Sequence, residues 1–158
     1  MRKNTLLFIL VTCIVSNLNS QKKFSNRKID NLKNQVQQLV EEDKKMTQVM
    51  IDKVFSFGEL GFQEFETSKY MGAILEENGF DVEYQVSNIP TSWLATWSNG
   101  EGGPVIALGS DFDGVPSTSQ YPGVAYEKPV VEGAPGHGEG HNIGLPIVVT
   151  SALSLKKI

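Results

Sequence analysis

The sequence of 158 residues contains one cysteine, Cys13, and it lies in an N-terminal segment that we expect to be removed. The mature chain would then have no thiol, which excludes a disulfide, a cysteine nucleophile and a cysteine-ligated zinc site. Any metal would have to be held by histidine, aspartate or glutamate. Histidine is nearly as scarce, because only His137 and His141 are present.

Basic residues are also few. The chain has 14 Lys and Arg against 18 Asp and Glu, a formal net charge of −4. No stripe of basic residues with interleaved aromatics is present, which argues against a nucleic-acid partner. With 40% hydrophobic and 20% charged residues, the composition is that of a globular protein. The length suits one compact domain.

The N-terminal segment has the order of a secretory signal. Arg2 and Lys3 precede an apolar run at residues 6–15, and small polar residues follow up to Ser20. The run is too short to span a bilayer comfortably. We therefore expect residues 1–20 to be a signal peptide and the protein to be secreted or periplasmic, with an uncleaved membrane anchor as the alternative.

Hydrophobic periodicity predicts the elements of the first half. Apolar residues at three- and four-residue steps predict a helix over residues 26–55, capped by Ser25 or Asn26. A second helix is expected to end at Asn78, with Gly79 in the left-handed position that follows a helix. Alternating apolar residues then predict a strand over residues 80–86.

The second half predicts more strands, a loop and a helix. Strands are expected at residues 93–98 and 104–109, joined by a glycine-rich hairpin, and residues 105–108 resemble a central strand covered on both faces. The segment 109–136 predicts a long ordered loop. A buried helix is expected after His141, with Pro146 in its first turn. This order predicts an α/β domain whose mixed sheet needs further strands.

Two aspartates follow the most apolar strand candidate. Asp111 and Asp113 are two residues apart, so in an extended segment they share a face. Either carboxylate could contact a metal or orient a ligand histidine. The alternative is a solvated turn rich in aspartate.

The segment GHGEGHN at residues 136–142 is the strongest candidate for chemistry. His137, Glu139 and His141 alternate with glycines, and imidazole and carboxylate suit zinc, manganese or cobalt. The alternative is a flexible surface loop. A catalytic zinc needs about three protein ligands and an open water position, and the water needs a base. Spacing alone therefore does not separate an enzyme from a fragment.

Several segments, taken in order, resemble the metal-dependent aminoacylase and carboxypeptidase family, in its branch of aminobenzoyl-glutamate utilisation protein B-like amidohydrolases. The similar segments are GELGFQEFETS at 58–68, IPTS at 89–92, SDFDGVPSTSQ at 110–120 and GHGEGHN at 136–142. The resemblance covers residues 45–158. Residues 26–158 would be the N-terminal part of a zinc-peptidase-like catalytic domain, and the family's lid or dimerisation domain is not matched.

The resemblance implies a function and a site. The family hydrolyses amide or peptide bonds in small N-acyl amino acids or dipeptide-like substrates, uses one or two divalent metal ions (zinc, manganese or cobalt), and forms homo-oligomers. His141 matches a metal-ligand histidine, and Glu139 stands where these amidohydrolases usually have a ligand cysteine. Asp113 matches an acidic catalytic residue that supports the site. Asp111 falls where the carboxypeptidases have a ligand histidine, and it and His137 are further candidates.

Two departures from the family pattern bear on activity. Glu139 replaces a soft thiolate by a hard carboxylate, which favours a less thiophilic metal than zinc. The family's paired glutamates, which supply the general base and a ligand, have no match, nor do its later histidine ligands. We therefore expect an inactive N-terminal part of an exported amidohydrolase. The alternatives are a non-catalytic metal-binding or interaction protein and a small hydrolase whose site assembles across a homodimer.

Overall fold

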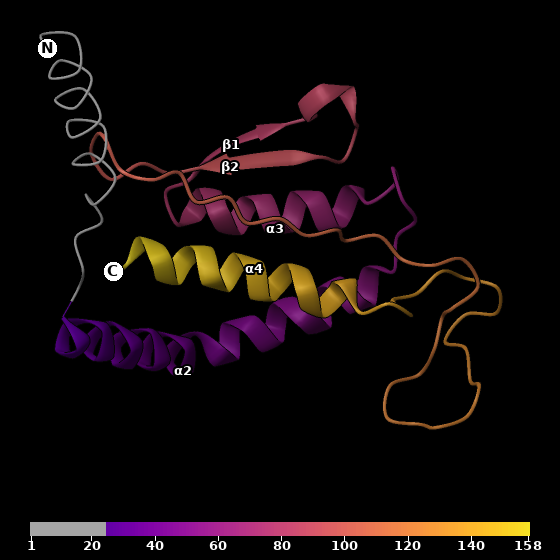
Figure 1. The fold of residues 1–158 in the computed structure, drawn as a ribbon. Helices are drawn as coiled ribbons and strands as arrows, with labels where there is room; N and C mark the ends of the chain where they lie inside the picture. The colour runs from indigo at the N-terminus through magenta and orange to yellow at the C-terminus, as the bar shows by residue number, and fades with distance from the viewer. Residues whose placement is uncertain (1–24) are drawn as a thin grey trace, which may run out of the picture. The chain divides into compact units, whose positions relative to one another are not determined.

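The computed structural model describes residues 25–158, and the expected signal peptide lies outside this range. The elements in chain order are helix α2 (Asn26–Phe57), helix α3 (Phe65–Glu77), strand β1 (Asp81–Tyr84), the short 3-10 helix η1 (Val86–Asn88), strand β2 (Trp93–Thr96) and helix α4 (His141–Lys156) (Figure 1). No helix among residues 25–158 is long and apolar enough to cross a membrane. The chain is a mixed α/β protein, as the sequence predicts at this level.

Helix α2 begins where the sequence predicts it. The Ser25 carbonyl accepts hydrogen bonds from the backbone N–H groups of Lys28 and Ile29, and the Ser25 hydroxyl accepts a weaker one from Lys28. The chain divides into two compact units, Met1–Asn34 and Gln35–Ile158. The helix starts in the first unit, and everything described below concerns the second.

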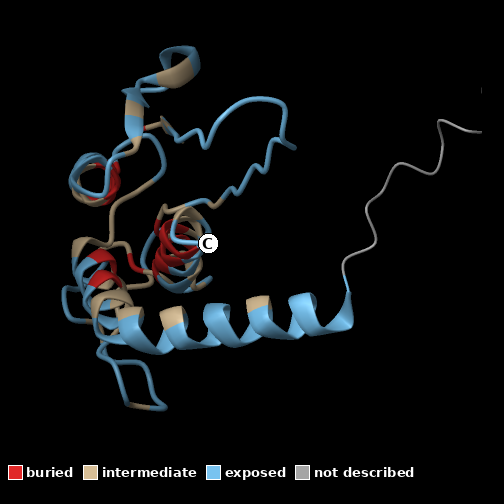
Figure 2. Ribbon diagram, turned by 90° about the vertical axis from the view of Figure 1, so that its left-hand side faces the viewer, coloured by how far each residue is buried: buried red, intermediate tan, exposed pale blue. Residues whose placement is uncertain are grey.

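The core of the second unit is made by three helices. Its fully buried side chains come from α2 (Met50, Val54), α3 (Met71, Leu75) and α4 (Leu145, Val149, Leu153). Helix α4 lies between the other two, and buried residues gather along it (Figures 1 and 2). Partly buried side chains of the two strands, such as Val82 and Ala95, pack against this core. The helices predicted from apolar periodicity therefore meet along those apolar stripes.

The end of α3 also follows the prediction. Asn78 is the residue at its C-terminal boundary, and Gly79 has a positive φ of 75°. The ammonium group of Lys156, at the end of α4, donates hydrogen bonds to the carbonyls of Asn78 and Gly79. A cation at the carboxyl end of α3 interacts favourably with that helix. The contact joins the last turns of α3 and α4.

Strands β1 and β2 form a two-stranded antiparallel sheet, with Asp81 opposite Thr96 and Tyr84 opposite Trp93. The prediction of a further strand at residues 104–109, paired to β2 through a hairpin, is wrong. No backbone hydrogen bond reaches this segment from residues 25–158. Val105 is 96% exposed and Ile106 65% exposed, so residues 105–108 are not a covered central strand either.

The physical reason for this difference is pairing. A strand exists only when its backbone groups bond to a neighbouring strand, and β2 already takes β1 as its partner. Among the described residues nothing pairs with residues 104–109 or covers their side chains. Apolar composition records a preference for burial, but it does not supply the partner.

Helix α4 starts earlier than predicted. The carbonyl of Gly140 accepts from the N–H groups of Ile143 and Gly144, so the first helical residue is His141. Pro146 is therefore inside the helix, in its second turn, and not in the first turn as expected. Without an N–H it cannot donate to the preceding turn. The hydroxyl of Thr150 donates to the Pro146 carbonyl, which adds a bond near this position.

Candidate metal centre

The long loop before α4 folds back on itself and brings its two ends together. Gly114 forms a parallel bridge with Leu60, and Val115 forms an antiparallel bridge with Gly136. In the second bridge, Val115 donates to the Gly136 carbonyl at 2.8 Å and Gly136 donates to the Val115 carbonyl at 3.1 Å. The bridge places the segment that carries Asp113 beside the segment that leads to His141. The prediction of a long ordered loop is confirmed.

Glycine is required where these backbones meet. A Cβ on Gly114 would lie 3.1 Å from the carbonyl oxygens of both Glu59 and Gly136. A Cβ on Gly136 would lie 2.5 Å from the carbonyl oxygen of Thr118, a backbone contact that real side chains do not make. The glycines of this region therefore permit close approach of three backbone segments.

Asp113 and His141 are in direct contact across the bridge. Nδ1 of His141 lies 2.9 Å from Oδ1 of Asp113 and 3.2 Å from the Asp113 carbonyl oxygen. Both acceptors call for a proton on Nδ1, so the neutral ring keeps its lone pair on Nε2. A carboxylate that fixes the tautomer of a histidine in this way is the usual support of a metal-ligand imidazole.

Glu139 lies on the other side of the same ring. Its Oε2 atom is 3.6 Å from Nε2 of His141, too far for a hydrogen bond. A tetrahedral centre with metal–ligand distances of about 2.1 Å separates neighbouring donor atoms by roughly 3.4 Å. The Glu139 side chain is 63% exposed and that of His141 25% exposed, so the space between these atoms opens to solvent. Their separation and chemistry fit two ligands of one divalent metal.

His137 turns away from this pair. Its Nε2 lies 3.0 Å from the carbonyl oxygen of Val54, near the end of α2. Burial lowers the pKa of His137 below its ordinary value, and the nearby His141 lowers it further, while hydrogen bonds to the Val54 and Asp113 backbone act in the opposite direction. Within the described part of the chain, Nδ1 of His137 is buried without a hydrogen-bond partner. The residue ties the loop to α2.

Asp111 does not join the pair of Asp113 and His141. It is exposed, and the ion pairs found within residues 25–158 do not include it. Over the same residues, no group of three or more His, Cys, Asp and Glu side chains is arranged to hold a metal ion. Of the candidates from the sequence, the structure therefore brings together Asp113, Glu139 and His141, with the histidine in the middle.

Glu59 supports the site and was not among the predicted site residues. Its carboxylate accepts from the backbone N–H groups of Glu66 and Thr67, both at 2.9 Å, and from the Thr67 hydroxyl at 2.8 Å. Its carbonyl oxygen accepts from the Gly114 N–H at 2.6 Å. One residue thus caps the start of α3 and holds the backbone next to Asp113. An acidic residue shortly before a helix was the available clue.

Thr118 is a second support that the sequence did not reveal. Its hydroxyl lies 2.9 Å from the carbonyl oxygen of Val115 and 2.8 Å from that of Gly136, the two residues of the bridge. Its position in a run of serines and threonines gave no indication of this role. The hydroxyl joins both sides of the loop directly beside the candidate centre.

Comparison with known proteins supports the resemblance of the motifs. No family model matches the chain. Over 118 residues the chain is 34% identical to the B-type component of p-aminobenzoyl-glutamate hydrolase from Escherichia coli (strain K12), and the match covers 75% of this chain and 24% of that protein. The chain thus spans about a quarter of the length of this relative. By this similarity, the chain belongs with the aminobenzoyl-glutamate utilisation B-like amidohydrolases.

Proposed function

We propose that this chain carries part of the divalent-metal centre of an amide-bond hydrolase, with Glu139 and His141 as metal ligands. The observation that carries the proposal is the position of the His141 ring, with Asp113 at 2.9 Å from Nδ1 and Glu139 at 3.6 Å from Nε2. The name of the E. coli relative specifies hydrolysis of p-aminobenzoyl-glutamate, a molecule cleaved at an amide bond. Small amides of this kind are the proposed substrate class.

Each residue has a distinct part in this proposal. Asp113 is a positioning residue, because it holds the proton of His141 on Nδ1 and leaves Nε2 free for a metal. Glu139 adds a hard oxygen ligand, which favours manganese or cobalt over a thiophilic preference for zinc. When bound, the metal supplies Lewis-acid activation of water and of the amide carbonyl. The remaining ligands and the general base are proposed to lie in sequence that corresponds to the other three quarters of the relative.

A chimaeric protein tests this function. The region of the E. coli relative that aligns with this chain would be replaced by the corresponding residues of this chain, and hydrolysis of p-aminobenzoyl-glutamate would be measured with added manganese. We expect hydrolysis that falls by about two orders of magnitude or more in His141→Ala, since a lost ligand removes the metal. The exposed Glu101→Ala, outside the site, is the matched control.

The result is judged against the folding of the chimaera. A chimaera that folds like the E. coli relative by circular dichroism and hydrolyses the substrate equally well with and without His141 would contradict the proposal. So would a folded chimaera that binds manganese with unchanged affinity in Glu139→Ala.

A further inference from the structure

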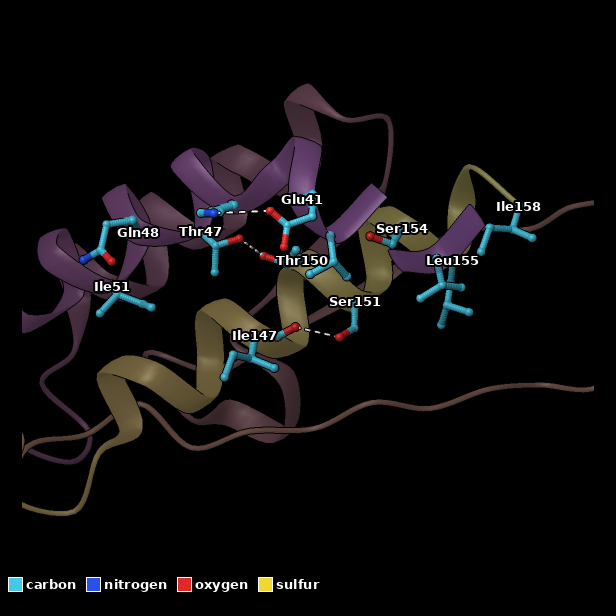
Figure 3. Close-up of a pocket in the computed structure, with 13 residues that line it drawn as sticks. Glu41, Thr47, Gln48, Ile51, Ile147, Thr150, Ser151, Ser154, Leu155 and Ile158 are labelled. Atoms are coloured by element: carbon cyan, nitrogen blue, oxygen red, sulfur yellow. Dashed lines mark hydrogen bonds and ion pairs between the residues drawn. The ribbon is translucent and has the colours of Figure 1, made fainter. Parts of the chain in front are cut away.

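An apolar groove runs between α2 and α4, and it is separate from the candidate metal centre. It encloses about 510 Å³. Its apolar lining residues come from α2 (Val36, Val40, Ile51) and from α4 and the residues that follow it (Ile147, Leu155, Ile158). Figure 3 shows Ile51 and Ile147 on facing helices, with Leu155 and Ile158 toward the end of α4.

The groove is open to solvent along an unusually apolar surface. Val40 is 49% exposed, Ile147 51% and Leu155 45%. On α2 the lining positions recur at helical spacing, and on α4 they do the same, so the two stripes form matching walls. Contiguous apolar patches of this kind on soluble proteins usually mark an interaction surface. Two parallel walls of helix side chains have the shape that receives another helix.

Helix α2 itself has the properties of that missing helix. Its buried residues, Met50 and Val54, lie in its C-terminal half. Further toward its start, Val36 and Val40 continue the apolar stripe but are 39% and 49% exposed. Within residues 35–158, this part of an amphipathic helix therefore presents its apolar face to solvent.

The charges at the edge of the groove identify which copy of α2 fits. Glu41 and Lys44 both line it, and their side chains are 67% and 74% exposed. Their mutual contact of 3.2 Å is an exposed pair of little energetic value. A two-fold axis passing α2 between these positions sets Glu41 of one copy opposite Lys44 of the other, twice. A parallel arrangement would place like charges together instead.

We propose that the chain forms an antiparallel homodimer in which α2 of each copy lies along the groove between α2 and α4 of the other. The contact is isologous, so each pairing occurs twice and both apolar stripes are covered in one step. The exposed valines of α2 supply the apolar contact, and the pairing of Glu41 with Lys44 fixes the antiparallel direction. This interface involves neither metal nor substrate.

The oligomeric state of the full chain, measured by sedimentation equilibrium over a wide range of concentrations, gives the first test. We expect a reversible dimer, and we expect Val40→Lys to be monomeric with unchanged helicity by circular dichroism. A wild-type chain that stays monomeric at every concentration would overturn the proposal, and binding of some other helix or membrane by that monomer would assign the groove to another occupant.

Charge reversal tests the direction and the register. Glu41→Lys and Lys44→Glu should each raise the dimer dissociation constant by about tenfold or more, because each brings like charges together twice. A mixture of the two variants should form heterodimers, and the double variant, in which the charges are exchanged, should again form homodimers. Glu77→Lys, at an exposed position of α3, is the matched control and should dimerise like the wild type.

The pattern across these variants is decisive. Equal dimerisation of all charge variants, or failure of the mixture to form heterodimers, would contradict the antiparallel α2 pairing even if the wild type were dimeric. Because no metal or substrate is present in these measurements, their outcome is independent of the proposed hydrolase function.

Discussion

Nδ1 of His141 lies 2.9 Å from the carboxylate of Asp113, although 28 residues separate the two in the sequence. The pair forms because the bridge between Val115 and Gly136 closes the loop between them. The carboxylate fixes the imidazole tautomer before any metal arrives, so the ligand nitrogen is already free. The contact gives the metal-centre hypothesis its main geometric support.

Removing this carboxylate should weaken metal binding without removing a ligand. We expect Asp113→Ala to reduce affinity for manganese by about 10- to 100-fold, the usual loss when the partner of a ligand histidine is deleted. Asp113→Asn keeps an oxygen acceptor for the Nδ1 proton and should restore part of the affinity. Calorimetric titration with manganese measures both variants. Equal affinities of wild type and Asp113→Ala would rule out the positioning role.

Changing Glu139 to cysteine should change the choice of metal. A thiolate is a softer ligand than a carboxylate, so Glu139→Cys should bind zinc more tightly relative to manganese than the wild type does. Competition of the two metals for each protein, in the presence of a reductant, gives the ratio of affinities. An unchanged ratio would show that residue 139 does not contact the metal.

The helical core should depend on the side chains that α4 places inside it. Leu145 is 1% exposed, so Leu145→Ala should lower the free energy of unfolding by about 2–5 kcal/mol. Ile143 is on the same helix but 47% exposed, and Ile143→Ala serves as the control with a much smaller loss. Urea denaturation followed by circular dichroism compares the two. Similar losses for both would mean that α4 is not packed as described.

The sheet should weaken at alkaline pH through Tyr84. Burial raises the pKa of Tyr84 above its ordinary value, and the charge and hydrogen bond of Glu76 raise it further. The folded protein thus prefers the neutral phenol. This contribution to stability is complete below about pH 10, the unfolded value, and is lost as the pH rises through the higher folded pKa.

Spectrophotometric titration of tyrosinate, as a difference between wild type and Tyr84→Phe, measures this group directly. We expect a midpoint above the ordinary tyrosine value. We also expect the melting temperature of Tyr84→Phe to fall less than that of the wild type at alkaline pH. A midpoint at or below the ordinary value would contradict the contact with Glu76.

The elements that the sequence predicts well are those whose signal is local. Apolar spacing located α2 and α3, and Gly79 marked the end of α3, because both depend on neighbours along the chain. Residues 104–109 were misassigned since a strand depends on a partner elsewhere. The position of Pro146 was misjudged because hydrogen bonds from Gly140 start the helix earlier.

The candidate site divides in the same way. The segment at residues 136–142 was recognisable from its residue types, but spacing did not distribute the two histidines. His141 meets Asp113, while His137 meets the backbone of Val54, which is 83 residues away. Both contacts arise from tertiary folding of the loop. The supports given by Glu59 and Thr118 likewise depend on distant backbone atoms.

The proposal that Glu139 and His141 hold a divalent metal is tested most directly by proton NMR of the chain's two histidines during addition of manganese. The account predicts that substoichiometric manganese selectively broadens the ring signals of His141 and that Glu139→Gln largely removes this broadening. Ring signals of His141 that stay sharp as manganese is added, or that broaden equally in the wild type and in Glu139→Gln, would contradict it.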